Sequence, residues 1–404
     1  MVSVGKGLPL TYRKTLLFLM FVLFIFIYAV TPISKNVVTA NKSPFDGKTE
    51  QIASQLTSLL TLEEKVGQLF IIGGNWKDPK SLNQIIQYHF GNAYLGTNDV
   101  GNMTPEEVTT LTQRLQKEAF KHNHQIPMFI FTDQEGGLVN RLKVGFVTFP
   151  SQEEMAQKPL ATIEQAARII ARQLRKVGIH VNLAPVIDVG INKASHIVKD
   201  HRAFSANPQD VAKYAGIYIK AFQEEGIIAC VKHFPNDGDL FQDPHFLFTV
   251  NPKSKKELLA TSLIPYQILI SEGLLQMLMV SHVAVPALEP DPNVPVSLSK
   301  NVIDGFLRKE MRFQGLVVID EMNMKALGKG KLPDEKRIRE ATINTFNAGA
   351  DLIIFTGFER THIAAYDELL KAYKDKRLST EQLNNTVKKI ISMKIQYLSD
   401  FKPY

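Results

Sequence analysis

The chain has 404 residues, of which 45% are hydrophobic and 22% are charged, and its formal net charge is +7. This composition is typical of a globular protein, and the length suits one large barrel or two smaller domains. The single cysteine, Cys230, excludes an internal disulfide framework and a cysteine-rich metal site. The charge is spread along the chain without a dense basic block, so we expect no nucleic-acid partner.

The first 50 residues differ in character from the rest. Cations at residues 6, 13 and 14 precede an uncharged stretch, 15–34. As a helix, such a stretch is about 30 Å long, which is enough to cross a bilayer, and the flanking cations favour a cytoplasmic N-terminus. We therefore expect a cytoplasmic segment (1–14), a membrane anchor (15–34) and a polar tether (35–50), with the remaining chain outside the cell membrane. The alternative is a signal peptide cleaved near Ala40, which would release a secreted protein.

Beyond residue 60, short apolar runs alternate with segments of helical periodicity. Capping boxes beginning at Thr61 and Thr104 predict two helix starts. Further helices are expected at 164–178, 210–226, 254–273 and 379–398. The runs that predict strands are 66–73, 92–97, 128–133, 180–186, 227–234, 276–283, 316–320 and 351–357.

Eight strands that alternate with helices indicate an α/β fold, a (β/α)8 TIM-type barrel, as a single catalytic domain over residues 51–404. An open, doubly wound sheet is the alternative. The sequence contains no glycine-rich dinucleotide fingerprint and no P-loop, which counts against the usual cofactor roles of that sheet.

Charged side chains follow several of these strands. Asp133, the pair Lys232-His233, His282 and Asp320 each stand at a predicted strand end. In barrels the active site lies where the strands meet the following loops, and burying unpaired charge costs about several kcal/mol, so convergence of these groups indicates function. Taken singly, each could be a strand cap or a solvated surface group.

The loop after Lys232-His233 carries Asp243 and His245, two residues apart. An imidazole beside a carboxylate is held in one tautomer and can have a pKa near neutrality, which suits general acid/base catalysis. A solvated loop is the alternative interpretation of this segment alone.

At these residues the chain resembles glycoside hydrolase family 3, in its NagZ-type β-N-acetylglucosaminidase branch. The resemblance covers roughly residues 50–400. The matching stretches, in family order, are 132–142 (TDQEGGLVNRL), 183–189 (LAPVIDV), 201–204 (HRAF), 231–245 (VKHFPNDGDLFQDPH), 280–288 (VSHVAVPAL) and 307–324 (LRKEMRFQGLVVIDEMNM).

The resemblance implies a retaining double displacement without a metal or another cofactor. Asp320 occupies the position of the nucleophile, His245 that of the acid/base and Asp243 that of its partner. The positions that bind sugar hydroxyls in the family are matched by Asp133, Arg141, Arg202, Lys232 and His233.

The expected activity is removal of non-reducing terminal GlcNAc from peptidoglycan-derived fragments. The chain departs from the family pattern at Leu138, Asn236-Asp237, Pro244 and Ile319. None of these changes removes a principal catalytic group. Two alternatives remain, namely a surface sugar-binding pseudoenzyme and a family 3 β-glycosidase of other specificity.

Four further polar residues receive structural interpretations. We expect Glu135 to tie loop amides, His282 to pack behind the site, and Glu321 to point outward from its strand end. Asp188 is either a hydrogen-bond hub or a site residue. No histidine pair has the i, i+4 spacing typical of a helical metal site, so we expect no metal.

Overall fold

The computed structural model describes residues 45–357 and 361–398. Eight parallel strands close into a barrel in the order β1-β10-β9-β8-β7-β6-β3-β2. They are β1 (Phe70–Ile72), β2 (Asn92–Tyr94), β3 (Phe129–Thr132), β6 (Val181–Asn182), β7 (Ile228–Phe234), β8 (Met277–Val280), β9 (Leu316–Glu321) and β10 (Leu352–Phe355). Seven of them lie within their predicted runs, and β9 extends one residue beyond the run 316–320, to Glu321. The barrel is therefore confirmed, and the open sheet is excluded because β1 pairs with both β2 and β10.

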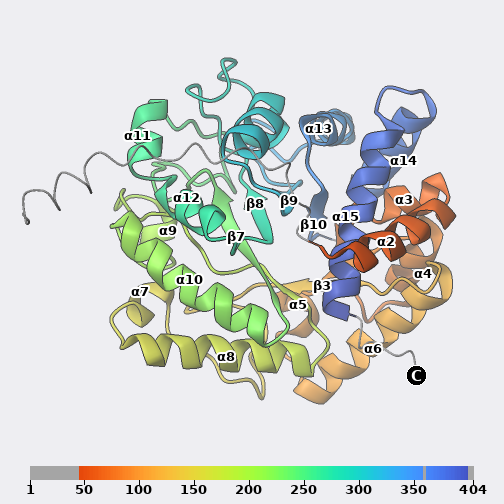
Figure 1. Ribbon diagram of the computed structural model, residues 1–404, viewed down its shortest axis with the longest axis horizontal. Coiled ribbons are helices and arrows are strands. Elements are labelled where there is room, and N and C mark those ends of the chain that lie inside the picture. The colour runs from red at the N-terminus through yellow and green to blue at the C-terminus, as the bar shows by residue number, and fades with distance from the viewer. Residues whose placement is uncertain (1–44, 358–360, 399–404) are drawn as a thin grey trace, which may run out of the picture. The chain divides into compact units, whose positions relative to one another are not determined.

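Helices surround this barrel, as Figure 1 shows. They are α2 (Gly47–Leu59), α3 (Leu62–Gly67), α4 (Pro79–Tyr88), α5 (Thr97–Val100), α6 (Pro105–His122), α7 (Gln152–Met155), α8 (Leu160–Lys176), α9 (His196–Lys199), α10 (Pro208–Glu224), α11 (Lys255–Ala260), α12 (Ile264–Ser271), α13 (Glu335–Ala348), α14 (Thr361–Lys374) and α15 (Thr380–Leu398). A 3-10 turn, η1 (Val296–Leu298), and a π-helix, η2 (Asn301–Glu310), lie between β8 and β9. A hairpin of β4 (Gln134–Gly136) and β5 (Val139–Asn140) follows β3.

The predicted helix starts are confirmed by their caps. Thr61 and Thr104 each accept a hydrogen bond from the backbone amide three residues later, and the glutamate there accepts one in return. The helix expected over 254–273 is instead two helices, α11 and α12. Pro265 lies in the first turn of α12, where its missing amide hydrogen is tolerated, whereas inside one long helix it would remove a hydrogen bond.

Packing at the two ends of the described chain closes the ring of helices. Helix α15 packs against α2. Helix α2 begins at Gly47, within the range 35–50 that its composition assigns to a tether, because the Asp46 side chain caps it by accepting from Thr49 N at 2.9 Å. The expected anchor, 15–34, lies outside the described residues. Within the described residues, no helix is long and apolar enough to span a membrane.

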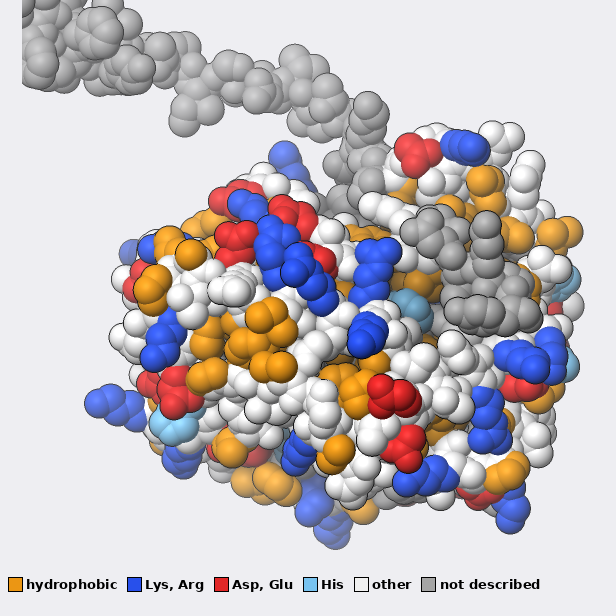
Figure 2. All heavy atoms as spheres, turned by 90° about the horizontal axis from the view of Figure 1, so that it is seen from below, with side chains coloured by type: hydrophobic (Ala, Val, Ile, Leu, Met, Phe, Trp, Pro, Cys, Tyr) orange, Lys and Arg blue, Asp and Glu red, His pale blue; other side chains and the backbone are white. Residues whose placement is uncertain are grey.

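The strands supply the core. Phe70 and Phe355, on the neighbouring strands β1 and β10, stack with ring centroids 6.2 Å apart. On the outer face in Figure 2, basic and acidic side chains are interspersed with apolar ones. The barrel thus supplies a rigid, apolar body, and its polar chemistry is concentrated at the ends of the strands.

Candidate active site

A cavity of about 320 Å³ opens at the C-terminal ends of the barrel strands. Every candidate residue except Asp243 lines it, and these seven come from segments far apart in the chain. They are Asp133, Arg141, Arg202, Lys232, His233, His245 and Asp320. The cavity also contains groups that the sequence analysis did not select for the site, namely Tyr94, Glu135, Val139, Leu183, Met279, Glu321, Ile354 and Thr356.

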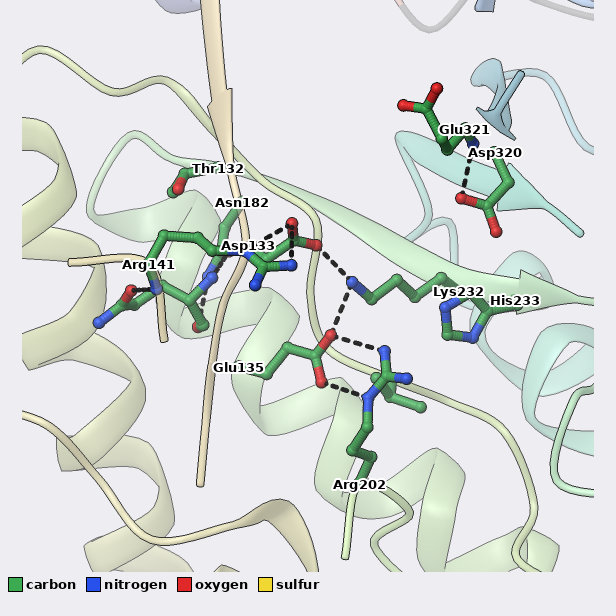
Figure 3. Close-up of polar contacts among 12 residues, drawn as sticks. Thr132, Asp133, Glu135, Arg141, Asn182, Arg202, Lys232, His233, Asp320 and Glu321 are labelled. Carbon is green, nitrogen blue, oxygen red and sulfur yellow. Dashed lines mark hydrogen bonds and ion pairs between the residues drawn. The ribbon is translucent and has the colours of Figure 1, made fainter. Parts of the chain in front are cut away.

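One side of the cavity is built from a network of ion pairs (Figure 3). Lys232 Nζ lies 2.6 Å from Asp133 Oδ1 and 2.6 Å from Glu135 Oε1. Arg202 binds both oxygens of Glu135 at 2.9 Å, a bidentate contact that fixes both groups. Glu135 therefore does not tie loop amides as expected, but orders two cations of the site.

The second oxygen of Asp133 is also occupied. Tyr94 Oη donates to Asp133 Oδ2 at 2.6 Å, and Arg141 Nη2 donates to the same oxygen at 3.2 Å. Burial alone would raise the pKa of Asp133, but the charges of Lys232 and Arg141 hold it well below its ordinary value. Asp133 is thus a permanently charged acceptor within the cavity.

Asp320 stands across the cavity from this network, beside the end of β7 (Figure 3). Its burial favours the neutral acid, but His233, His282 and His245 together lower its pKa below the ordinary value. Glu321 N donates to Asp320 Oδ1 at 2.8 Å. The arrangement presents an ionised carboxylate inside the pocket.

A further residue, Asp188, orders the histidine that faces Asp320. Asp188 Oδ2 lies 2.7 Å from His233 Nδ1, and Asp188 Oδ1 accepts from Asp237 N at 2.7 Å. Of the two roles that the sequence analysis considered for Asp188, these contacts favour the hydrogen-bond hub. His282 packs behind the site as expected, with Nδ1 at 2.8 Å from Ser297 Oγ and Nε2 at 3.1 Å from the Glu321 carbonyl oxygen.

The Asp243–His245 pair lies at the rim. His245 Nδ1 is 2.7 Å from Asp243 Oδ1, which also accepts from His245 N at 2.9 Å. Burial opposes the charged imidazole, but the contact with Asp243 and the charge of Asp320 raise the pKa of His245 above its ordinary value. The His245 side chain remains 48% exposed, so it can exchange protons with a bound molecule and with solvent.

Two β-bulges bring consecutive side chains into the cavity. Val231 pairs with Leu278 but Phe234 pairs with Val280, so β7 has one extra residue, and both Lys232 and His233 line the pocket. A similar shift between β9 and β10 occurs at Asp320, and both Asp320 and Glu321 line the pocket. Bulges re-aim side chains in this way. The prediction that Glu321 points outward is therefore wrong, because the extra residue in β9 turns its side chain toward the cavity.

Glu321 has its own fixed partners. It accepts from Thr356 N, and its other oxygen accepts from Asn323 N at 3.0 Å. Burial raises the pKa of Glu321 to about 7. The residue therefore links β9 to the loop after β10 and adds a second carboxyl group beside Asp320.

The departures from the family pattern have ordinary structural places. Asn236 is buried, and its Oδ1 accepts from Val189 N at 2.7 Å. Ile319 is a core residue of β9, whereas Leu138 is 73% exposed between β4 and β5. Burial and the neighbouring Asp188 raise the pKa of Asp237 well above its ordinary value. None of these residues lines the cavity.

Comparisons with known proteins agree with this geometry. A β-hexosaminidase from Stenotrophomonas maltophilia is 30% identical over 286 residues, which cover 69% of this chain and 78% of that enzyme. β-Hexosaminidase A of Pseudoalteromonas piscicida is 29% identical over 344 residues, but the match covers 78% of this chain and 55% of that longer protein.

Solved structures share the fold. A glycoside hydrolase family 3 β-N-acetylglucosaminidase from Paenibacillus sp. FPU-7 has a TM-score of 0.78 and 32% identity, covering 85% of this chain and 64% of that one. LpqI of Mycobacterium tuberculosis, a β-hexosaminidase, has a TM-score of 0.73 and 27% identity, and the match covers 85% of this chain and 96% of LpqI.

The sequence model of the glycosyl hydrolase family 3 N-terminal domain matches residues 61–393. That range contains all eight barrel strands and every residue that lines the cavity. By this match, and in agreement with its fold, the chain belongs to glycosyl hydrolase family 3.

Proposed function

We propose that the protein is a retaining exo-β-N-acetylglucosaminidase in which Asp320 is the nucleophile and His245 the general acid/base. One observation carries this proposal. A carboxylate with a lowered pKa and an imidazole with a raised pKa line the same small cavity, and each contributes to the shift of the other. Two groups whose environments push their pKa values apart are the pattern of an acid/base pair.

In the first step, an oxygen of Asp320 attacks the anomeric carbon and the bond to the leaving oxygen breaks. The protonated imidazole of His245 gives its proton to that oxygen, so the aglycone departs as a neutral alcohol. The pKa of Asp320 is lowered, which keeps it available as an anion, and that of His245 is raised, which keeps its proton available near neutrality.

In the second step, the neutral His245 takes a proton from water, whose oxygen attacks the anomeric carbon and releases Asp320. The exposed position of His245 supports this role, because water can reach the ring once the aglycone has left. Asp243 acts as a positioning residue, since its Oδ1 holds both the ring and the backbone of His245.

The charged network opposite Asp320 would bind the sugar hydroxyls. Asp133 accepts hydrogen bonds, whereas Arg141, Arg202 and Lys232 donate them, and their contacts with Asp133 and Glu135 fix them before a ligand arrives. His233, which Asp188 holds beside Asp320, is a further candidate to bind the sugar. A cavity of about 320 Å³ lies at the lower end of the range for small-molecule sites, about 300–1,000 Å³. A pocket of that size favours one terminal sugar, and hence an exo mode of cleavage.

We propose GlcNAc as that sugar because the similar proteins are described as β-hexosaminidases and β-N-acetylglucosaminidases. Peptidoglycan-derived GlcNAc-MurNAc fragments are the proposed natural substrates. They lie outside the cell membrane, where the expected anchor at 15–34 would hold the catalytic domain.

The test compares full-length protein on aryl β-GlcNAc, aryl β-glucoside and GlcNAc-MurNAc. Hydrolysis of the two GlcNAc substrates, with the β-anomer released first, supports the proposal. Preference for the glucoside would indicate a β-glycosidase of other specificity. Saturable GlcNAc binding without hydrolysis of any substrate would instead indicate a sugar-binding pseudoenzyme.

A further inference from the structure

We propose that His196, Asp243 and His245 form a binding site for a divalent transition-metal cation, above all Zn²⁺, at the rim of the cavity. One potential ligand atom from each residue lies within 4.8 Å of the others. Asp243 Oδ1 lies 2.7 Å from His245 Nδ1 and 3.9 Å from His196 Nδ1. The two imidazole rings meet edge to face, with centroids 5.7 Å apart.

His196 supplies the second, independent observation. Its side chain is only 12% exposed, and both ring nitrogens are buried without a hydrogen-bond partner among the described residues. A buried polar group without a partner costs about 1–3 kcal/mol, so such groups normally have one. His196 begins the short helix α9, where the Ser195 cap holds the backbone in place. Its imidazole, which makes no hydrogen bond among the described residues, therefore lies near a carboxylate and a second imidazole.

This set of ligands identifies the class of cation. Zn²⁺ binds imidazole nitrogen and carboxylate oxygen at about 2.0–2.2 Å in tetrahedral sites, which places ligand atoms about 3.3 Å apart. The separations of Asp243 Oδ1 from the two imidazole nitrogens, 2.7 and 3.9 Å, lie on either side of that spacing, so small side-chain movements suffice. Three protein ligands leave the fourth position to water. Mg²⁺ and Ca²⁺ prefer oxygen ligands and fit poorly.

Local sequence patterns do not predict this site, because its ligands come from two separate segments. His196 follows β6, whereas Asp243 and His245 belong to the loop after β7. The expectation of no metal rested on the lack of helical histidine spacing and on a mechanism that needs no metal, and neither reason covers ligands from two separate segments. The barrel brings these two connections together at one rim.

Occupation of the site would affect turnover, and this effect, unlike the binding itself, rests on the proposed role of His245. A nitrogen that coordinates Zn²⁺ cannot carry a proton or contact Asp243. Bound Zn²⁺ would therefore hold the acid/base and its partner away from the leaving oxygen. The site would act as an inhibitory metal switch.

Binding is tested by titrating Zn²⁺ into EDTA-treated full-length protein in a calorimeter. We expect one Zn²⁺ per chain at micromolar affinity or tighter, and no heat with Mg²⁺. His196→Ala should weaken binding at least tenfold, and His196→Gln, which retains more of the side-chain volume, should do the same. His122→Ala is the matched control, because His122 is an exposed histidine at the end of α6.

Equal Zn²⁺ affinity in wild type and in both folded His196 variants would overturn the site, as would the lack of stoichiometric binding. In the activity assay, Zn²⁺ should inhibit wild type at the binding midpoint, EDTA should reverse this, and His196→Ala should raise the inhibitory concentration at least tenfold. Zn²⁺ that binds through His196 but leaves turnover unchanged would contradict the switch. A chain that binds Zn²⁺ but hydrolyses no substrate would contradict only the proposed function.

Discussion

Lys232 Nζ contacts Asp133 Oδ1 at 2.6 Å across the mouth of the barrel, from β7 to the end of β3. Strand β6 lies between these two strands, so the contact bridges a gap that no backbone pairing crosses. Both side chains are nearly inaccessible to solvent. A buried ion pair of this kind is costly to break, because the remaining partner stays charged away from water.

We therefore expect Lys232→Met to lower the free energy of unfolding by about 3 kcal/mol. The variant leaves Asp133 and Glu135 close together without the cation between them. Chemical denaturation monitored by circular dichroism provides the measurement. The matched control is Lys255→Met, because Lys255 pairs with Glu310 at 2.8 Å on the surface, where such pairs contribute less than about 1 kcal/mol. Equal losses in the two variants would contradict the structural role of Lys232.

The acid/base role of His245 predicts an effect that depends on the leaving group. His245→Gly should reduce kcat/KM far more for a sugar aglycone than for an activated aryl one, because the aryl oxygen leaves without a proton. Azide should restore turnover of the aryl substrate, since it attacks without a base. His122→Ala serves as the control. Equal losses on both substrates, without rescue by azide, would assign the loop a structural role.

Asp243→Asn should have a milder effect than His245→Gly. The asparagine can still hold the ring, but it removes the negative charge that helps to raise the pKa of His245. The alkaline limb of the kcat/KM profile should therefore move to lower pH, because His245 would lose its proton earlier as the pH rises. An unchanged pH profile would show that Asp243 acts only through packing.

The fold was predictable because strand and helix periods differ, and because capping residues such as Thr61 and Thr104 mark helix starts. The site was predictable in part, since charged residues at strand ends of a barrel converge. Glu321 was not, because one extra residue in β9 reverses the direction that alternation assigns to its side chain. Tyr94 was also missed, since an aromatic residue in an apolar run has the pattern of the core.

Contacts between distant segments could not be predicted from local patterns. Arg202 and Glu135 are 67 residues apart in sequence, and His196 and Asp243 belong to different connections of the barrel. Spacing in the sequence does not predict such pairs, because they come together only when the closed barrel brings the connections to one rim.

Lys394, in α15, predicts a pH-dependent stability away from the site. Its buried Nζ donates to Gln68 Oε1 at 2.7 Å and to the Gly91 carbonyl oxygen at 2.8 Å, and burial lowers its pKa to about 7. The unfolded chain keeps this proton up to a pH of about 10.4. Above pH 7 the unfolded state therefore binds more protons than the folded state, and stability from this group rises with pH.

We expect the stability of Lys394→Met relative to wild type to fall by up to about 1.4 kcal/mol per pH unit between pH 7 and 9. The methionine removes the titrating group but keeps the volume of its stem. Urea denaturation of both proteins at several pH values provides the measurement. The pKa of Lys389 is also lowered, but this residue is present in both proteins, so its contribution cancels from the difference in stability. A constant difference across this range would show that Lys394 stays charged in the folded protein.

The uncharged stretch 15–34 predicts membrane attachment of the full-length chain. The protein should sediment with membranes and resist carbonate extraction, because about twenty apolar residues span a bilayer. Deletion of residues 1–34 should release it into the soluble fraction. Mature protein in the medium that begins near Asn41 would instead indicate a cleaved signal peptide.

The central claim, that Asp320 forms a covalent glycosyl-enzyme, is tested most directly by trapping that intermediate. In His245→Gly, an activated aryl β-GlcNAc should still glycosylate Asp320, but water attack lacks its base, so the adduct should accumulate. Mass spectrometry of the intact protein and of its peptides should find one N-acetylhexosamine on the peptide that contains Asp320. The double variant, which carries Asp320→Asn in addition to His245→Gly, should carry none. An adduct on another residue, or turnover that yields the inverted anomer, would contradict the account.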